Sequence, residues 1–302
     1  MRPLDIGVYA PAGAAADPAA VTRGVERLAA LGHRVVLDEG VLRRHTRFAG
    51  TDEERLAAIG RIAARGDVDV AVALRGGYGT TRLLGRLDYA SLARSGKRWL
   101  GHSDFTAFQL AGLARAGMVS YAGPAFAYDF GAAEASEFTL SHCFGLLDAR
   151  SYEVRCPLDG PSRLDTDGTL WGGNLAMVAS LAGTPYLPSI DGGILFLEDV
   201  GEHPYRLERM FHQLAYAGIL DRQSAVLLGE FTEYALAPHD QGYDLAAAVA
   251  RLRAITPTPV FTGLPFGHVR DKLTLPVGGR LALAVRDGDA RLAFHDYAVG
   301  AR

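Results

Sequence analysis

The stretch from residue 5 to residue 76 decides the fold, because short β-rich runs alternate there with longer amphipathic segments. In order, the segments are DIGVYAP (5–11), DPAAVTRGVERLAALG (17–32), HRVVLDE (33–39), TDEERLAAIGRIAARG (51–66) and VDVAVALRG (68–76). Strands separated by helices of this length predict a parallel sheet with helices on its faces and right-handed crossovers. Such sheets bind ligands outside the carboxyl ends of their strands, so functional residues are expected there.

The same alternation continues through SGKRWLGHSDFTAF (95–108), which contains a sharp turn from a strand into a helix that is expected to begin at Phe105. A turn of this kind exposes a serine hydroxyl, here that of Ser103, near helix amides that can stabilise an oxyanion. Ser103 or Asp104 can instead simply cap the helix, since both residue types are favoured at that position. His102 is expected to point away from Ser103.

The pattern of the sequence changes near residue 150. The segment SYEVRCPLDGPSRLDTDGTLWGG (151–173) predicts short strands and turns rich in Gly, Asp and Pro. Further strands and helices follow in no strict alternation, and the chain closes in β-rich segments. We therefore predict an α/β protein with two domains. An N-terminal domain over 1–150 has a parallel, flavodoxin-like sheet, and a C-terminal domain over 151–302 is mixed α+β.

The composition is that of an ordinary globular protein, with 49% hydrophobic and 22% charged residues in 302. The formal net charge of -3 does not favour nucleic acid or an anionic membrane as a partner, so neither is expected. Cys143 and Cys156 lack CxxC spacing and nearby ligand clusters, so neither a disulfide framework nor a metal site is expected. An N-terminus without an apolar signal region, and the lack of a long apolar run, predict a cytoplasmic protein.

The glycine-rich stretch LRGGYGTTRLL (74–84) follows a strand and precedes a helix, so Gly76, Gly77 and Gly79 can present backbone N–H groups to an anion. As a nucleotide site it lacks the Lys-Ser/Thr ending of a P-loop and has only the first half of G-x-G-x-x-G. The loop can also supply one amide to an oxyanion hole, beside the amide of Asp104. A tight turn without a ligand is the third interpretation, and the residues alone leave all three open.

Two downstream segments supply an acid and a base. Glu198 closes the strand GILFLE, with Asp199, Glu202 and Glu208 as competitors. Glu202 and Glu208 lie in or near the opening of a helix, where acids are expected for dipole reasons. His268 lies in a turn after Pro-Phe-Gly and is therefore a loop histidine. The order Ser103, Glu198, His268 is that of α/β hydrolases and fits nucleophilic catalysis. The elbow departs from G-x-S-x-G, because a phenylalanine replaces the second glycine, so an ordinary α/β-hydrolase fold is not expected.

Six blocks occur in a specific order along the chain: LRGGYGTTRLL (74–84), GHSDFTAFQLA (101–111), YAGPAFAYDFGA (121–132), GTLWGGNLAMVASLAGTPYLP (168–188), LEDVGEHPYRLERMFHQLAYAGIL (197–220) and GLPFGH (263–268). Together they resemble the LD-carboxypeptidases, most closely the muramoyltetrapeptide carboxypeptidases of peptidoglycan recycling. The resemblance covers nearly the whole chain. It implies an N-terminal parallel α/β domain, a C-terminal mixed domain, an active site in the cleft between them, and a homodimer.

The resemblance also implies residue roles. It implies a catalytic triad of Ser103, Glu198 and His268, and an oxyanion hole made by the amides of Asp104 and Gly77. The implied reaction is hydrolysis of the bond that joins the L-centre of the third residue to the terminal D-Ala of a murein tetrapeptide or muropeptide. No cofactor and no metal is expected.

The candidate substrate contacts are residues that lie close to these motifs in the sequence. The terminal carboxylate needs a cation or an amide nest, and three arginines lie close to the motifs: Arg75, Arg206 and Arg270. Gly76, beside the oxyanion loop, is a further candidate contact. Trp171 and Asn174 in the WGGN turn are expected to contact substrate, although Trp171 can equally be a packed anchor at the seam between the domains.

Three alternatives remain. A microcin-immunity-type serine peptidase would share the triad but cleave a peptidyl-nucleotide amide, and the match around WGGNLAM and EDVGEHPYR favours the recycling branch over it. A non-enzymatic sensor of murein fragments would keep the cleft without turnover, against which the intact triad argues. A flavodoxin-like nucleotide-binding protein using the GGYG loop would be stabilised thermally by nucleotides or flavins.

Overall fold

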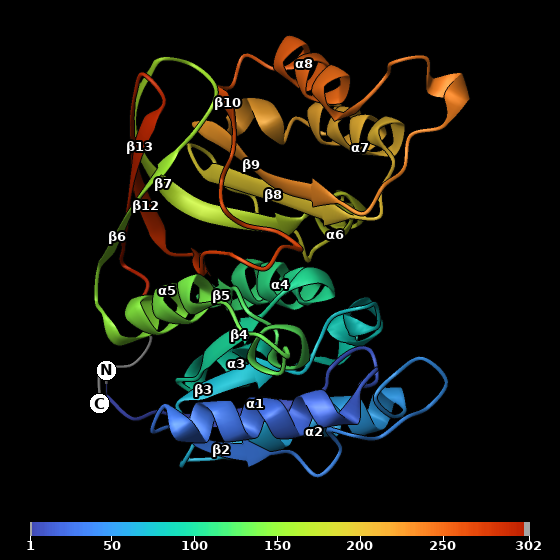
Figure 1. The fold of residues 1–302 in the computed structure, drawn as a ribbon, viewed down its shortest axis with the longest axis vertical. Coiled ribbons are helices and arrows are strands. Elements are labelled where there is room, and N and C mark those ends of the chain that lie inside the picture. The colour runs from blue at the N-terminus through green and yellow to red at the C-terminus, as the bar shows by residue number, and fades with distance from the viewer. Residues whose placement is uncertain (1, 299–302) are drawn as a thin grey trace.

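The computed structural model describes residues 2–298, which form a six-stranded and a seven-stranded sheet with helices between and around them (Figure 1). The first sheet has the order β11-β5-β4-β3-β1-β2, and the second has the order β10-β9-β8-β7-β12-β13-β6. Helix α4 (Thr106–Ala116) lies between the two, since it packs on the first sheet and also contacts β7 and α6 of the second half. The mixed α/β architecture predicted from the sequence is confirmed.

The first half contains the predicted βαβαβ series. Its strands are β1 (Asp5–Tyr9), β2 (Arg34–Leu37), β3 (Val70–Ala73), β4 (Arg98–Gly101) and β5 (Ser120–Ala122). Its helices, besides α4, are α1 (Pro18–Ala30), α2 (Asp52–Ala64), α3 (Tyr89–Arg94) and α5 (Glu137–Asp148). The pairs β1–β2, β1–β3, β3–β4 and β4–β5 are all parallel, so the carboxyl ends of β3 and β4 meet at one edge of the sheet.

Local chemistry explains where the helices start. At α1, Asp17 accepts a hydrogen bond from the amide of Ala19, and Pro18 occupies the first helical position, where no N–H is needed. At α2, Thr51 and Glu54 form a capping box, in which each side chain accepts from the other residue's amide. These caps fix the lengths of the crossovers that keep the strands parallel.

The second half is mixed, as predicted. Its strands are β6 (Tyr152–Pro157), β7 (Arg163–Asn174), β8 (Ile194–Val200), β9 (Ala225–Thr232), β10 (Val260–Thr262), β12 (Arg280–Arg286) and β13 (Asp289–His295). Its helices are α6 (Leu175–Leu181), α7 (Pro204–Tyr216) and α8 (Leu245–Ile255). Strands β7 to β10 run parallel, whereas β7, β12, β13 and β6 are antiparallel neighbours.

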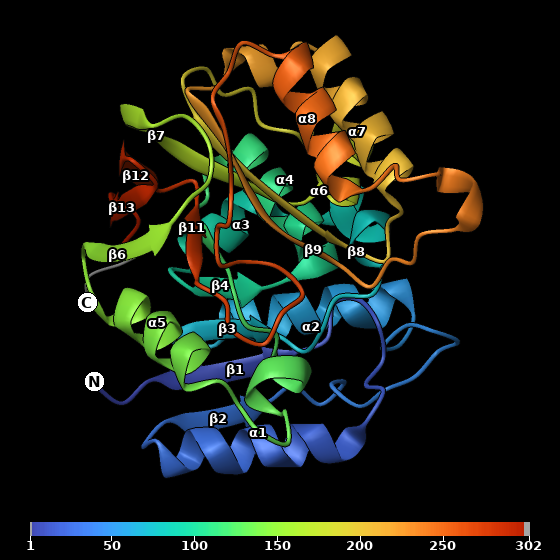
Figure 2. The ribbon, with the colours of Figure 1, turned by 45° about the horizontal axis from the view of Figure 1, so that its top comes forward.

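One strand links the halves. The short β11 (Leu275–Val277) comes from the C-terminal half, yet it pairs antiparallel with β5 at the edge of the first sheet (Figure 2, red strand beside the green and blue sheet). A strand of three residues has too little periodicity to be assigned to a sheet from sequence. As a result, the chain just after His268 is anchored to the sheet that carries Ser103. Within residues 2–298, no helix has both the length and the apolar character needed to cross a membrane.

Candidate active site

The turn after β4 holds Ser103 in a strained conformation. Ser103 has a φ of 64°, in the left-handed region that non-glycine residues seldom occupy. A 3-10 turn over Ser103–Phe105 follows, and α4 begins at Thr106 rather than at Phe105 as predicted. A Cβ on Gly101 would lie 2.3 Å from the Phe105 ring, so the strand must end in glycine for the turn to close this tightly. The turn leaves Ser103 on the wall of a cavity.

The glycine-rich loop after β3 lies directly against this turn. A Cβ on Gly76 would lie 2.8 Å from the Ser103 Cβ and 3.0 Å from the Asp104 amide nitrogen, so only glycine fits there. At the other end of the loop, the Thr80 amide donates to the buried Asp104 carboxylate at 2.9 Å, and burial raises the pKa of that carboxyl. Gly77 has a φ of 88° and lines the cavity with Gly76.

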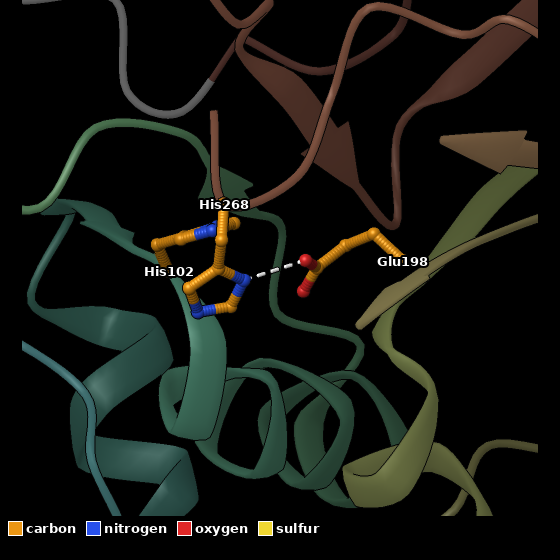
Figure 3. Close-up of side chains that lie close together, drawn as sticks. All are labelled: His102, Glu198 and His268. Atoms are coloured by element: carbon orange, nitrogen blue, oxygen red, sulfur yellow. Dashed lines mark hydrogen bonds and ion pairs between the residues drawn. The ribbon is translucent and has the colours of Figure 1, made fainter. Parts of the chain in front are cut away.

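The wall formed by the second half of the chain carries His268, which forms a close pair with Glu198. The Nδ1 of His268 lies 2.7 Å from Oε2 of Glu198, which is fully buried on β8 (Figure 3). If Nδ1 carries the proton and donates it to the carboxylate, Nε2 of His268 is left with a free lone pair. His268 itself lines the cavity, because Gly267, with a φ of 143°, turns the loop toward it. His268 lies in a loop, as predicted. Glu198 was predicted to close its strand, but β8 continues to Val200.

His102, which was predicted to point away from Ser103, lines the same cavity as Ser103 and lies beside His268. Its ring centroid lies 4.5 Å from that of His268 and 5.3 Å from that of Phe266, and Figure 3 shows it beside His268. Burial, reinforced by the charges of His268 and Lys272, holds the pKa of His102 well below 6.5. The backbone of His102 is extended, and the left-handed Ser103 follows it directly.

His102, Glu198 and His268 together form a cluster that can be considered for a metal ion. They offer one ligand atom each, all within 4.8 Å of one another. Ligand atoms around a tetrahedral zinc ion lie about 3.4 Å apart, so the cluster would have to contract. The contact between Glu198 and His268 is also already a direct hydrogen bond. This donor set therefore fits an acid–base pair better than a metal centre.

The loop that carries His268 is fastened to the first half of the molecule by polar contacts. The Lys272 ammonium forms a 2.7 Å ion pair with Asp129, and both side chains are almost fully buried. Thr139 of α5 donates its hydroxyl to the Arg270 carbonyl at 2.8 Å and accepts from the Lys272 amide at 2.9 Å. These contacts attach the loop to α5 and to the turn that carries Asp129.

Between these walls lies a cavity of about 570 Å³, lined by residues of both halves. Its walls include Arg75 and Arg270, as well as Ser103 and His268. Arg75 donates to a backbone carbonyl at 3.2 Å and lies 5.2 Å from the centroid of the Tyr128 ring. In the described part of the chain, neither arginine forms an ion pair with an acidic side chain. Both guanidinium groups are thus available to an anion in the cavity.

Other predicted site residues lie elsewhere. Trp171 is buried and donates to Gln223 at 2.8 Å, which corresponds to the packed-anchor alternative, and it does not line the cavity. Asn174 is also outside the lining, and its side chain contacts the carboxylates of β8. Arg206 is exposed on α7 and pairs with Glu202, away from the cavity.

Asp129, Lys272 and Tyr128 were not among the residues predicted to belong to the site. Asp129 and Tyr128 lie in a one-turn π-helix over Phe126–Phe130, a feature that often marks functional sites but has no simple sequence signature. The pairing of Asp129 with Lys272 joins positions 143 residues apart. Such contacts depend on the tertiary fold.

Comparison with known proteins follows the same division of the chain. The N-terminal domain model of the LD-carboxypeptidases matches residues 6–123, and their C-terminal domain model matches residues 167–283. The chain belongs to the LD-carboxypeptidase family. This LD-carboxypeptidase is accordingly a serine-type carboxypeptidase and a hydrolase.

Individual relatives cover almost the entire LD-carboxypeptidase chain. The solved structure of muramoyltetrapeptide carboxypeptidase from Oxalobacter formigenes is 47% identical, with a TM-score of 0.91 over 97% of this chain and 99% of the other. The murein tetrapeptide carboxypeptidase of Pseudomonas aeruginosa is 32% identical over 92% of each chain. The microcin C7 self-immunity protein MccF of Escherichia coli is 28% identical over 93% of this chain and 92% of its own.

Proposed function

We propose that this LD-carboxypeptidase hydrolyses the L,D peptide bond that releases the terminal D-Ala from murein tetrapeptides, with Ser103, Glu198 and His268 as its catalytic triad. The observation that carries the proposal is the 2.7 Å contact between His268 and the buried Glu198, on a cavity whose other wall presents the strained Ser103. A nucleophile, a base and an orienting acid are the parts that acyl transfer needs.

In the mechanism, Nε2 of His268 takes the hydroxyl proton of Ser103 as the oxygen attacks the carbonyl carbon of the scissile bond. The Glu198 carboxylate stabilises the imidazolium that forms, because it accepts from Nδ1. The imidazolium then gives its proton to the nitrogen of the departing D-Ala. A water molecule attacks the acyl-enzyme by the same route and regenerates Ser103.

The oxyanion hole is proposed to use the backbone amides of Asp104 and Gly77. Asp104 lies in the first turn of a helix, where amides have no acceptor within the helix and carry the positive end of its dipole. Gly77 follows Gly76, the residue that packs directly on Ser103, so its amide is close to the nucleophile. Fixed donors of this kind stabilise the charge that develops in the transition state.

Arg75 is the proposed partner of the terminal carboxylate. It lines the cavity next to the oxyanion loop, and its Nε is buried without a hydrogen-bond partner. Arg270 also lines the cavity but is exposed. A carboxylate held by Arg75 would direct the terminal residue toward the loop and the bond before it toward Ser103, which accounts for carboxypeptidase rather than endopeptidase action.

The cellular setting is also a proposal. We propose a cytoplasmic homodimer that acts on recycled murein fragments and needs no cofactor. The buried cysteines Cys143 and Cys156 are both unpaired, which is compatible with a reducing compartment. Light scattering after size-exclusion chromatography tests the dimer, and a monomer mass would contradict it.

The test of the function is mass-spectrometric detection of D-Ala released from L-Ala-D-Glu-meso-diaminopimelyl-D-Ala. The wild type is expected to release D-Ala, whereas Ser103→Ala loses at least about 10⁴-fold in rate, and the exposed Ser141→Ala on α5 serves as the matched control. An all-L tetrapeptide should not be cleaved. Undiminished release by Ser103→Ala would remove Ser103 as the nucleophile. No release by the wild type, with cleavage of a peptidyl-nucleotide amide, would favour the alternative of a microcin-immunity-type serine peptidase.

A further inference from the structure

Asp199 is a buried acid that does not reach the cavity. It follows Glu198 on β8, is only 3% exposed and is absent from the cavity lining. Its Oδ1 accepts from the Asn174 side-chain amide at 2.8 Å and from the Val200 amide at 2.9 Å. Its Oδ2 accepts from the Ala176 amide, in the first turn of α6, at 2.8 Å. Both carboxylate oxygens of Asp199 therefore accept hydrogen bonds.

Asn174 links this acid to both walls of the site. The nitrogen that donates to Asp199 also lies 3.4 Å from Oε1 of Glu198, whose other oxygen contacts His268. The Asn174 backbone amide donates to the Thr106 hydroxyl at 3.1 Å, and Thr106 opens the helix that follows Ser103. Asn174 therefore contacts the acid–base pair through its side chain and the helix after Ser103 through its backbone.

The local shape of β8 lets the Asn174 amide lie close to both Glu198 and Asp199. Successive side chains of a regular strand point to opposite faces, so Glu198 and Asp199 would ordinarily diverge. The pairing of β8 with β9 shifts register between Leu197 and Asp199, an irregularity of the kind that re-aims side chains. Burial, together with the Glu198 charge, raises the pKa of Asp199 to about 6. The fold thus keeps two carboxylates together despite their repulsion.

We propose that Asp199 is a positioning residue for hydrolysis: it holds the Asn174 amide, and the amide holds the Glu198 carboxylate in the orientation that serves His268. The proposal rests on the roles given to Glu198 and His268 under the proposed function. The competing explanation is that Asp199 only caps the N-terminus of α6, through Ala176. A purely structural role would affect stability without affecting the titration of His268.

Two substitutions break the network at different points. Asp199→Asn removes the charge and one acceptor, while Asn174→Ser deletes the amide donor but keeps an oxygen that can cap α6 at Met177. Each is expected to lower kcat for D-Ala release by about tenfold to a hundredfold through misplacement of the base, with KM changed less than about threefold. The double variant should be no worse than the poorer single variant, because both act through one contact.

Asp244→Asn is the matched control. Asp244 caps α8 by accepting from the Ala247 amide, and it does not line the cavity. Its kcat should equal that of the wild type. Thermal unfolding of all variants shows which of them remain folded at the assay temperature. An unchanged kcat in folded Asp199→Asn, or a loss equal to that of Asp244→Asn, would overturn the proposal.

A second readout needs no substrate. The NMR resonance of the His268 ring, assigned with His268→Gln, is titrated in the wild type and in Asp199→Asn. Glu198 is the charged group that acts on Asp199, and the remaining contacts of Asp199 are amide donors of β7, α6 and β8. Removing a negative charge behind Glu198 should move the titration midpoint of His268 to lower pH.

An unmoved His268 midpoint would contradict the coupling. If the wild type releases no D-Ala at all, the proposed function fails, and the titration still decides whether Asp199 acts on His268. If the wild type releases D-Ala but neither the kcat nor the titration responds to Asp199→Asn, only the positioning role fails. The two failures are therefore distinguishable.

Discussion

The cavity wall that carries Ser103 and the wall that carries His268 position their side chains by different means. Ser103 is fixed by backbone geometry: a φ of 64°, a glycine before the turn and Gly76 packed on its Cβ. His268 is fixed by side chains, because Glu198 binds its ring and the Lys272–Asp129 pair fastens its loop. The first wall is built from two successive strand-end loops, whereas the second joins residues as far apart in the sequence as Asp129 and Lys272. Mutations on the two walls should therefore fail in different ways.

The largest expected effect comes from Glu198, the acid that binds His268. Glu198→Gln keeps the shape of the residue but removes the charge that stabilises an imidazolium, so kcat for D-Ala release should fall about 10⁴-fold. Steady-state kinetics measures this loss. The control is Glu208→Gln, because Glu208 accepts from the Tyr243 hydroxyl, does not line the cavity and should not affect turnover. A loss below tenfold in Glu198→Gln would mean that His268 does not depend on Glu198.

The next effect concerns the fastening of the His268 loop. Lys272→Met leaves the buried Asp129 carboxylate without its partner and should lower the free energy of unfolding by about 3 to 5 kcal/mol. Adding Asp129→Asn should recover part of that loss. Urea unfolding is the measurement. Arg155→Met, which breaks an exposed ion pair with Asp289, should cost about 1 kcal/mol or less. Equal losses in the two proteins would show that the buried pair has no special role.

On the wall that carries Ser103, a single added methyl group should be enough to damage catalysis. Gly76→Ala places a Cβ 2.8 Å from that of Ser103, so the loop or the nucleophile must shift. We expect kcat to fall about 10² to 10³-fold, the loss typical of a displaced oxyanion-hole donor. Gly60→Ala on α2 is the control, because the new Cβ would meet no atom within 4 Å other than those of its chain neighbours and its own helix backbone. It should raise stability by about 0.5 to 1 kcal/mol and leave kcat unchanged. Activity of Gly76→Ala near that of the control would contradict the close packing.

The smallest expected effect is a pH dependence of the free energy of unfolding, which arises from Asp199 beside Glu198. The pKa of Asp199 is raised to about 6, above its ordinary 3.8, by burial and by the Glu198 charge. Between these pH values the folded protein binds more protons than the unfolded chain, so this group adds stability as the pH falls. From pH 7 to pH 4, the wild type should gain up to about 3 kcal/mol relative to Asp199→Asn, which lacks the ionisation. Urea unfolding at both pH values checks this, and a constant difference would contradict it.

The same contrast explains what the sequence could predict. The parallel sheet, the strand-to-helix turn at Ser103 and the glycine loop were predictable, because each is encoded by neighbouring residues. Glu198 and His268 were singled out by their strand-end and loop settings and by a family resemblance. The inward position of His102, the Lys272–Asp129 pair and the attachment of β11 to the first sheet were not predictable, because they join residues that only the tertiary fold brings together.

The most direct test of the account is whether the two walls act as one site. A fluorophosphonate reacts with a serine hydroxyl only when a neighbouring base activates it, so its labelling rate can be measured without any murein substrate. Peptide mass spectrometry should locate the adduct on Ser103 in the wild type, and the labelling should slow at least about a hundredfold in Glu198→Gln. An adduct on another residue, or equal labelling rates in the two proteins, would contradict the account.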